Sequence, residues 1–210
     1  AGSSRKLVLI SAPAGYGKTT LITSWLHQFD QEQQKPAPKI GWLSLDEDDN
    51  QLRRFFASVA AALQPGLASP SALEARLALP EPVNGRSLSL ALIEDATAVS
   101  HPLYLILDDY HLIRQTEIHE ALAFLLERMP PHVHLLLTSR TRPPLKPDEF
   151  SRPPAIATVP PMTPPAALAV ALAVTLAVAL AVTPPDARPI SVPVPNDQTP
   201  SAIATASICP

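Results

Sequence analysis

The sequence is poor in cysteine, glycine and basic residues, and each shortage excludes a class of protein. One cysteine, Cys209, among 210 residues excludes an internal disulfide framework and a cysteine-based zinc site. The 6 glycines all lie at or before Gly85. Lysine and arginine number 16 against 19 aspartates and glutamates, and the net charge is −3. This balance excludes nucleic-acid binding by bulk positive charge.

A secretory signal is also missing from the beginning of the sequence. No basic segment followed by an apolar stretch opens the chain. Together with the lack of paired cysteines, this predicts a cytoplasmic protein.

Proline is abundant and unevenly placed. Of the 26 prolines, 16 lie in residues 143–210. Average proline usage is about 5%, so the last third is not ordinary globular sequence. We therefore predict a domain over residues 1–146 and a separate low-complexity tail over residues 147–210, rich in proline, alanine and valine.

Short apolar runs alternate with helical patterns throughout the first part. Strands are expected at 7–10, 40–45, 103–107 and 133–138, and helices at 19–29, 51–63, 71–79, 87–99 and 118–129. Apolar runs that are too short for a helix are typical of strands buried on both faces of a parallel sheet. The pattern predicts an α/β fold in which ligands bind beyond the carboxyl ends of the strands.

A phosphate-binding loop follows the first expected strand. Residues 12–20 (APAGYGKTT) fit that motif, with Ala12 in place of its first glycine. Gly15 and Gly17 allow successive N–H groups to point at an anion, and Lys18 can bridge two phosphates. The alternative is an accidental glycine turn, but strand, loop and helix stand in the required order. The predicted phosphate-binding residues are Ala14, Gly15, Tyr16, Gly17, Lys18, Thr19 and Thr20.

Two acids follow the third expected strand. Asp108 is predicted to hold Mg²⁺ together with the Thr19 hydroxyl, and Asp109 to orient or activate an attacking water. The alternative is that both are turn or helix-capping aspartates, which are common after strands. The phosphate-binding loop favours the metal interpretation.

Arg140 follows the fourth expected strand. At that place it could contact a terminal phosphate in a bidentate manner and report its presence. The alternative is an ordinary surface arginine.

Four segments in order carry a resemblance to a known family. They are residues 6–27 (KLVLISAPAGYGKTTLITSWLH), 41–64 (GWLSLDEDDNQLRRFFASVAAALQ), 102–114 (PLYLILDDYHLIR) and 134–146 (HLLLTSRTRPPLK). Residues 5–145 resemble the ATP-binding module of STAND-class signal-transducing ATPases, in particular the large LuxR-type, MalT-like regulators. Asp46, Asp48 and Asp49 in the second segment are expected to cap the helix at Gln51.

The resemblance implies a P-loop NTPase, AAA-like three-layer sandwich that binds ATP or ADP with Mg²⁺ and works as a switch with slow or absent hydrolysis. In the full-length family an inducer and promoter DNA are partners, but no DNA-binding region is visible in this chain. The chain begins just before the first strand, where the family has a segment that contacts adenine. The alternative function is a standalone P-loop ATPase or small-molecule kinase, which would need a substrate lid and further arginines near the phosphates.

The family pattern stops after Leu145, where the proline-rich tail begins. We expect this tail to be disordered or a frameshifted reading of the gene, and the fifth strand of the fold to be missing. Residues 7–10 would then form an exposed apolar edge. An apolar repeat at 166–182 reaches the lower limit of a membrane span, but it lacks flanking anchors, so membrane insertion is not expected.

Overall fold

A parallel five-stranded sheet forms the centre of the computed structural model, which describes residues 6–31, 36–67, 71–80, 82–145 and 155–158. The strand order across the sheet is β2-β3-β4-β1-β5, and every neighbouring pair is parallel. The strands are β1 (Leu7–Ser11), β2 (Lys39–Ser44), β3 (Leu103–Asp108), β4 (Val133–Ser139) and β5 (Ala155–Thr158).

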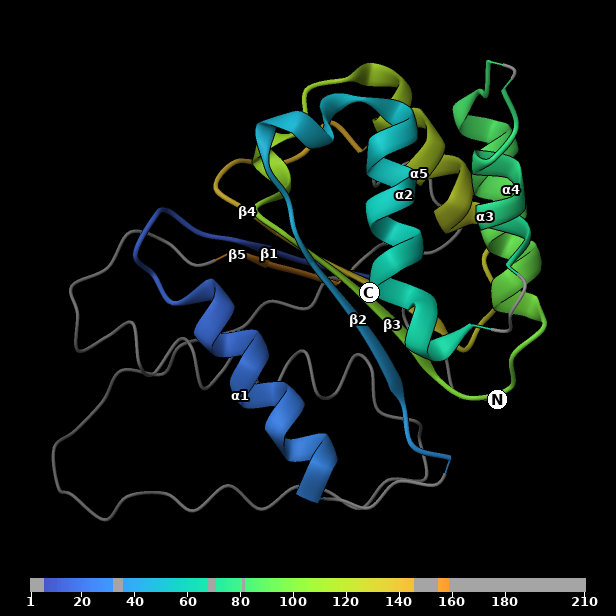
Figure 1. The fold of residues 1–210 in the computed structure, drawn as a ribbon. Helices are drawn as coiled ribbons and strands as arrows, with labels where there is room; N and C mark the ends of the chain where they lie inside the picture. Colours follow the sequence, from blue (N-terminus) through green and yellow to red (C-terminus); the bar gives the residue numbers. More distant parts are fainter. Residues whose placement is uncertain (1–5, 32–35, 68–70, 81, 146–154, 159–210) are drawn as a thin grey trace, which may run out of the picture.

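Helices cover both faces of this sheet, as Figure 1 shows, with α1 on one side and α2 to α5 on the other. The helices are α1 (Lys18–Gln31), α2 (Leu52–Leu63), α3 (Ala72–Leu77), α4 (Gly85–Thr97) and α5 (Thr116–Arg128). Short 3-10 turns are η1 (Glu47–Asn50), η2 (Gln64–Gly66) and η3 (Tyr110–Leu112). The arrangement is a three-layer α/β sandwich.

The two faces of β1 enter two different cores. Leu7 and Leu9 belong to the larger cluster, which includes residues of α2, α4 and α5. Val8 and Ile10 belong to the smaller cluster with Trp25 and other residues of α1. Because successive strand residues point to opposite faces, a strand between two helical layers must be apolar at every position.

The expected fold class is confirmed. Every strand and helix expected within the first 146 residues is present, with ends that differ by at most two residues. The carboxyl ends of β1, β3 and β4 lead directly into the segments predicted to bind ligand.

The expectation that the fifth strand is missing was wrong. Strand β5 pairs in parallel with β1, in a register that runs from Val8 with Ala155 to Ser11 with Thr158. Strand β1 therefore lies between β4 and β5 and is not a sheet edge. The physical reason is that an added strand needs only backbone N–H and C=O groups in an extended stretch free of proline, which residues 155–158 provide.

Strand β5 belongs to the sheet although it lies beyond residue 146, the predicted end of the domain. The position of the domain's end stays a prediction. The predictions for residues 147–154 and 159–210, including the apolar repeat and the frameshift, fall outside the described residues. Within the part of the chain that the structure describes, no helix is long and apolar enough to span a membrane.

Candidate functional site

The loop between β1 and α1 has the backbone of an anion-binding turn. Gly15 has φ +81° and Gly17 has φ +70°, in the left-handed region where glycine carries no steric cost. A Cβ added at Gly15 would meet nothing within 4 Å, so backbone conformation accounts for glycine there. Helix α1 begins at Lys18, which brings its first N–H groups to the same turn.

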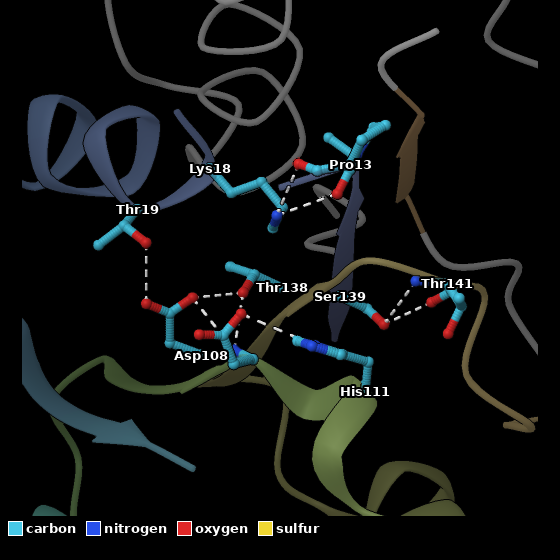
Figure 2. A network of polar contacts seen from close by, with 10 residues as sticks. Pro13, Lys18, Thr19, Asp108, His111, Thr138, Ser139 and Thr141 are labelled. Atoms are coloured by element: carbon cyan, nitrogen blue, oxygen red, sulfur yellow. Dashed lines mark hydrogen bonds and ion pairs between the residues drawn. The ribbon is translucent and has the colours of Figure 1, made fainter. Parts of the chain in front are cut away.

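Lys18 is buried and is held by its own loop. Its Nζ donates to the carbonyl oxygen of Ala12 at 2.9 Å and to that of Pro13 at 3.1 Å (Figure 2). Burial lowers the pKa of Lys18, while the negative charge of Asp109 acts in the opposite direction. The ammonium group therefore lies within electrostatic reach of the acid that follows β3.

A direct contact between the loop after β1 and the acids at the end of β3 joins Thr19 and Asp108. Thr19 Oγ1 donates to Asp108 Oδ2 at 2.9 Å. The other carboxylate oxygen, Oδ1, accepts from Thr138 Oγ1 and from the N–H of Asp109 at 3.2 Å. Asp108 is buried, and its contacts bring β3, β4 and the start of α1 together at one rim of the sheet (Figure 2).

Asp109 has an unusual backbone conformation. It has φ 57° and ψ 38°, and among the described residues it is the one non-glycine residue with positive φ. Aspartate tolerates this left-handed region better than most residues. Its N–H donates to Thr138 Oγ1 at 3.0 Å as well as to Asp108, so the backbone is firmly placed. Its side chain is 43% exposed and lies 3.7 Å from Nδ1 of His111, measured from Oδ1.

Arg140 follows β4 and is exposed. Its positive charge lowers the pKa of Lys18 and of His111, in each case after the larger effect of burial. The residue before it, Ser139, accepts the N–H of Ala12 on its carbonyl oxygen at 3.1 Å. This backbone contact places the start of the Arg140 segment beside the phosphate-binding loop.

The structure thus brings Lys18, Thr19, Asp108, Asp109 and Arg140 to one rim. The other predicted loop residues are exposed or half-buried there: Ala14, Gly15, Tyr16, Gly17 and Thr20. The roles predicted for all of these residues remain predictions.

Sequence reasoning missed two residues of the site, Thr138 and His111. Thr138 is a hydroxyl residue near the end of an apolar strand, and this was the available signal. His111 stands two residues after Asp109, and no motif in the sequence singled it out.

The acidic motif after β2 caps η1 and not α2. Asp46 Oδ1 accepts from the N–H of Asp48 at 2.8 Å and of Asp49 at 3.2 Å, and Asp49 Oδ2 accepts from the N–H of Asp46 at 3.0 Å. Helix α2 starts later, after Gln51, without a side-chain cap. The expected cap at Gln51 was wrong because the carboxylates of Asp46 and Asp49 bond to each other's backbone N–H groups around η1, and the N-cap residue of α2 is Gln51 itself, whose side chain makes no capping hydrogen bond.

Asn50 connects this motif to the segment that follows the acids. Its Nδ2 donates to the carbonyl oxygen of Leu112 at 2.9 Å. Its Oδ1 accepts from the N–H of Arg114 at 2.6 Å and of Gln115 at 3.2 Å. Two carbonyl and two N–H partners on opposite sides define the orientation of the amide. Asn50 therefore holds the segment that carries η3.

The oxygen donors at this rim suit Mg²⁺. A threonine hydroxyl and a carboxylate are hard ligands of the kind that Mg²⁺ takes from protein, with phosphate oxygens and water completing its shell. Thr19 and Asp108 already lie within hydrogen-bond distance of each other, so their oxygens converge on one place.

Comparisons with known proteins show what this chain is similar to. Residues 1–138 match the model of the AAA ATPase domain family. The chain is 43% identical over 143 residues to the HTH-type transcriptional regulator MalT of Yersinia enterocolitica, and equally to that of Serratia proteamaculans. Each match covers 67% of this chain but only 15% of the regulator, so the chain spans about a seventh of these relatives.

Among solved structures, Cdc6p from Pyrobaculum aerophilum is similar with a TM-score of 0.49 and 15% identity. That match covers 82% of this chain and 44% of the other. A likeness of this strength supports no argument about function.

Proposed function

The chain belongs to the AAA ATPase domain family, and from this premise we propose that it is the ATP-binding module of a LuxR-type, MalT-like transcriptional regulator. The family implies nucleotide binding. In our proposal the module binds ATP or ADP with Mg²⁺. Binding of ATP switches the module on, and slow hydrolysis of the ATP switches it off.

One observation carries this proposal: the hydrogen bond of 2.9 Å between Thr19 Oγ1 and Asp108 Oδ2. These two residues are 89 positions apart in the sequence. They come from different elements, and their oxygens are the ligand types that Mg²⁺ takes beside a triphosphate. A purely structural turn has no need to bring a loop threonine to a buried strand-end carboxylate.

Each residue of the rim has a definite task in this proposal. The backbone N–H groups of residues 14–20 bind phosphate oxygens, and Lys18 exchanges its carbonyl partners for phosphate when ATP enters. Thr19 and Asp108 would hold Mg²⁺, which when bound neutralises charge on the phosphates. Asp109 orients the attacking water, and Arg140 contacts the terminal phosphate.

The larger regulator would contain the further parts. The relatives are named as HTH-type transcriptional regulators, and this chain matches 15% of their length. We therefore assign promoter DNA and an inducer to other regions of such a protein. We include a cytoplasmic location in the proposal, because a regulator that acts on promoter DNA must be located with that DNA.

The test is calorimetric titration with ATP, with Mg²⁺ and with a chelator, on the wild-type chain and three variants. We expect Lys18→Ala to lose ATP binding and Thr19→Val to lose the affinity gained from Mg²⁺. Thr23→Val is the matched control, because Thr23 lies on the same helix and its hydroxyl donates to the backbone carbonyl oxygen of Thr20 at 2.9 Å. ATP affinity that does not respond to Mg²⁺ or to Lys18→Ala would refute the proposal.

The rate of hydrolysis tests the switch separately from binding. Phosphate release measured in steady state should be slow, below about 1 per second, the lower end of usual enzyme turnover. Rapid turnover would instead favour a standalone ATPase and would contradict the switch.

A further inference from the structure

His111 carries a polar atom whose role the proposed site does not explain. Its side chain is 14% exposed, and its Nδ1 is buried without a hydrogen-bond partner among the described residues. Burying a polar group without a partner costs free energy, so such an atom in a native site calls for an explanation. In Figure 2 the ring extends from η3 toward the acids that follow β3.

The group that this nitrogen faces is the carboxylate of Asp109. Asp109 Oδ1 lies 3.7 Å from His111 Nδ1. Burial lowers the pKa of His111, and the positive charge of Arg140 lowers it further, against the opposite effect of Asp109. The ring is therefore neutral at pH 7, with one N–H and one lone pair. A carboxylate attracts the N–H and repels the lone pair, so the proton belongs on Nδ1.

Asp109 needs such a partner. Two hydrogen bonds from its N–H fix its left-handed backbone, at 3.2 Å to Asp108 Oδ1 and at 3.0 Å to Thr138 Oγ1. Within the described part of the chain, its carboxylate accepts no hydrogen bond, and the ring of His111 lies 3.7 Å from it. The backbone is placed, but the rotation of the side chain is left to His111.

We propose that His111 is a positioning residue for Asp109: its Nδ1–H points at Asp109 Oδ1, so that the second carboxylate oxygen stays free to accept a hydrogen bond from the attacking water. This inference rests on the proposed function for the identity of that water. The contact between the two side chains does not depend on ATP.

The segment around His111 is held rigidly enough for this task. Asn50 accepts from the N–H of Arg114 and donates to the carbonyl oxygen of Leu112, and the N–H of Leu112 donates to Asp109 O at 3.0 Å. Tyr110, next to His111, is buried. The ring is thus attached to a short turn that is bonded at both ends.

Two substitutions of His111, by side chains of nearly equal size, distinguish a positioning role of this residue from a packing role. Asparagine places its amide at the distance of Nδ1, whereas glutamine places it at the distance of Nε2. We expect His111→Gln to lower kcat about 10- to 100-fold, the effect of misplacing a group by about 1 Å. We expect His111→Asn to stay within about 3-fold of wild type, with the Kd for Mg·ATP unchanged in both.

A second arm asks whether the effect passes through Asp109. Once Asp109→Asn has been made, adding His111→Gln should lower kcat no further. Additive losses, or a His111→Gln variant with wild-type turnover, would overturn the inference. Thermal unfolding of each variant verifies that it folds.

A third arm uses the nucleotide-free wild-type chain and needs no turnover. Imidazole ¹⁵N NMR should show the proton of neutral His111 on Nδ1, and Asp109→Asn should shift the His111 ring signals. A proton on Nε2, or His111 ring signals that do not shift in Asp109→Asn, would overturn the inference. If the chain fails to bind Mg·ATP, the proposed function fails, and these spectra still decide whether His111 orients Asp109.

Discussion

Replacing Asn50 tests whether the motif after β2 supports the site. In Asn50→Ala the carbonyl oxygen of Leu112 loses its donor at 2.9 Å, and the N–H groups of Arg114 and Gln115 lose their acceptor. The bond to Leu112 is partly buried and contributes about 1 kcal/mol, while water replaces much of the exposed bonds, which together add about 1 kcal/mol. We expect the free energy of unfolding to fall by about 2 kcal/mol and Tm to fall by about 4–8 °C.

The same contacts predict that Asn50→Asp is no milder than Asn50→Ala, although aspartate is nearly the same size. The carboxylate keeps the acceptor for Arg114, but it turns an oxygen toward the carbonyls of Glu47 and Leu112, where the amide donated at 3.0 and 2.9 Å. Facing acceptors repel each other, so the substitution loses two bonds and adds a repulsion.

Asn84→Ala is the matched control for both variants. Asn84 caps α4 by accepting from the N–H of Ser87 at 2.8 Å, so its loss costs about 1 kcal/mol away from the site. Urea unfolding gives the stability of each variant, and amide hydrogen exchange follows the segment after β3. We expect faster exchange over residues 110–115 in Asn50→Ala and Asn50→Asp, but not in Asn84→Ala. Equal exchange in Asn50→Ala and Asn84→Ala would refute the role of Asn50.

Two further predictions concern buried ionisable groups. Asp95 accepts hydrogen bonds from Ser71 Oγ at 2.5 Å and from two N–H groups at the start of α3. Asp95→Ala should therefore lower the free energy of unfolding, measured in urea, by about 3 kcal/mol. A loss no larger than that of the exposed Glu94→Ala would contradict this prediction. Burial lowers the pKa of His119, whose Nδ1 lies 2.6 Å from the hydroxyl of Tyr110. Below about pH 6.5, His119 therefore binds a proton in the unfolded chain but stays neutral in the folded chain. The free energy of unfolding should decrease as pH falls through that value. His119→Gln should flatten this slope in pH-dependent urea unfolding, and an unchanged slope would mean that His119 is not its source.

The strands and the rim of the site could be predicted because both depend on local patterns. A strand between two helical layers is apolar at most positions, and residues 103–108 and 133–139 end in polar residues at one rim. Parallel strands bring those ends together without further information. Thr19 and Asp108 could therefore be paired from sequence alone, although they lie far apart in the chain.

Asn50, Thr138 and His111 could not be assigned in the same way. Each acts through a contact with a residue on another element or beyond a turn, and none belongs to a periodic pattern. A side-chain amide after a helical turn most often bonds locally. Only the tertiary structure shows that Asn50 reaches the carbonyl oxygen of Leu112, 62 positions away.

Strand β5 shows where composition fails as a guide to structure. By composition, residues 147–210 resemble one uniform segment, because proline dominates their average. Pairing is decided over much shorter lengths: four residues, Ala155 to Thr158, occupy one register beside β1. Because β1 is flanked on both sides, the predicted apolar edge is absent within the described sheet.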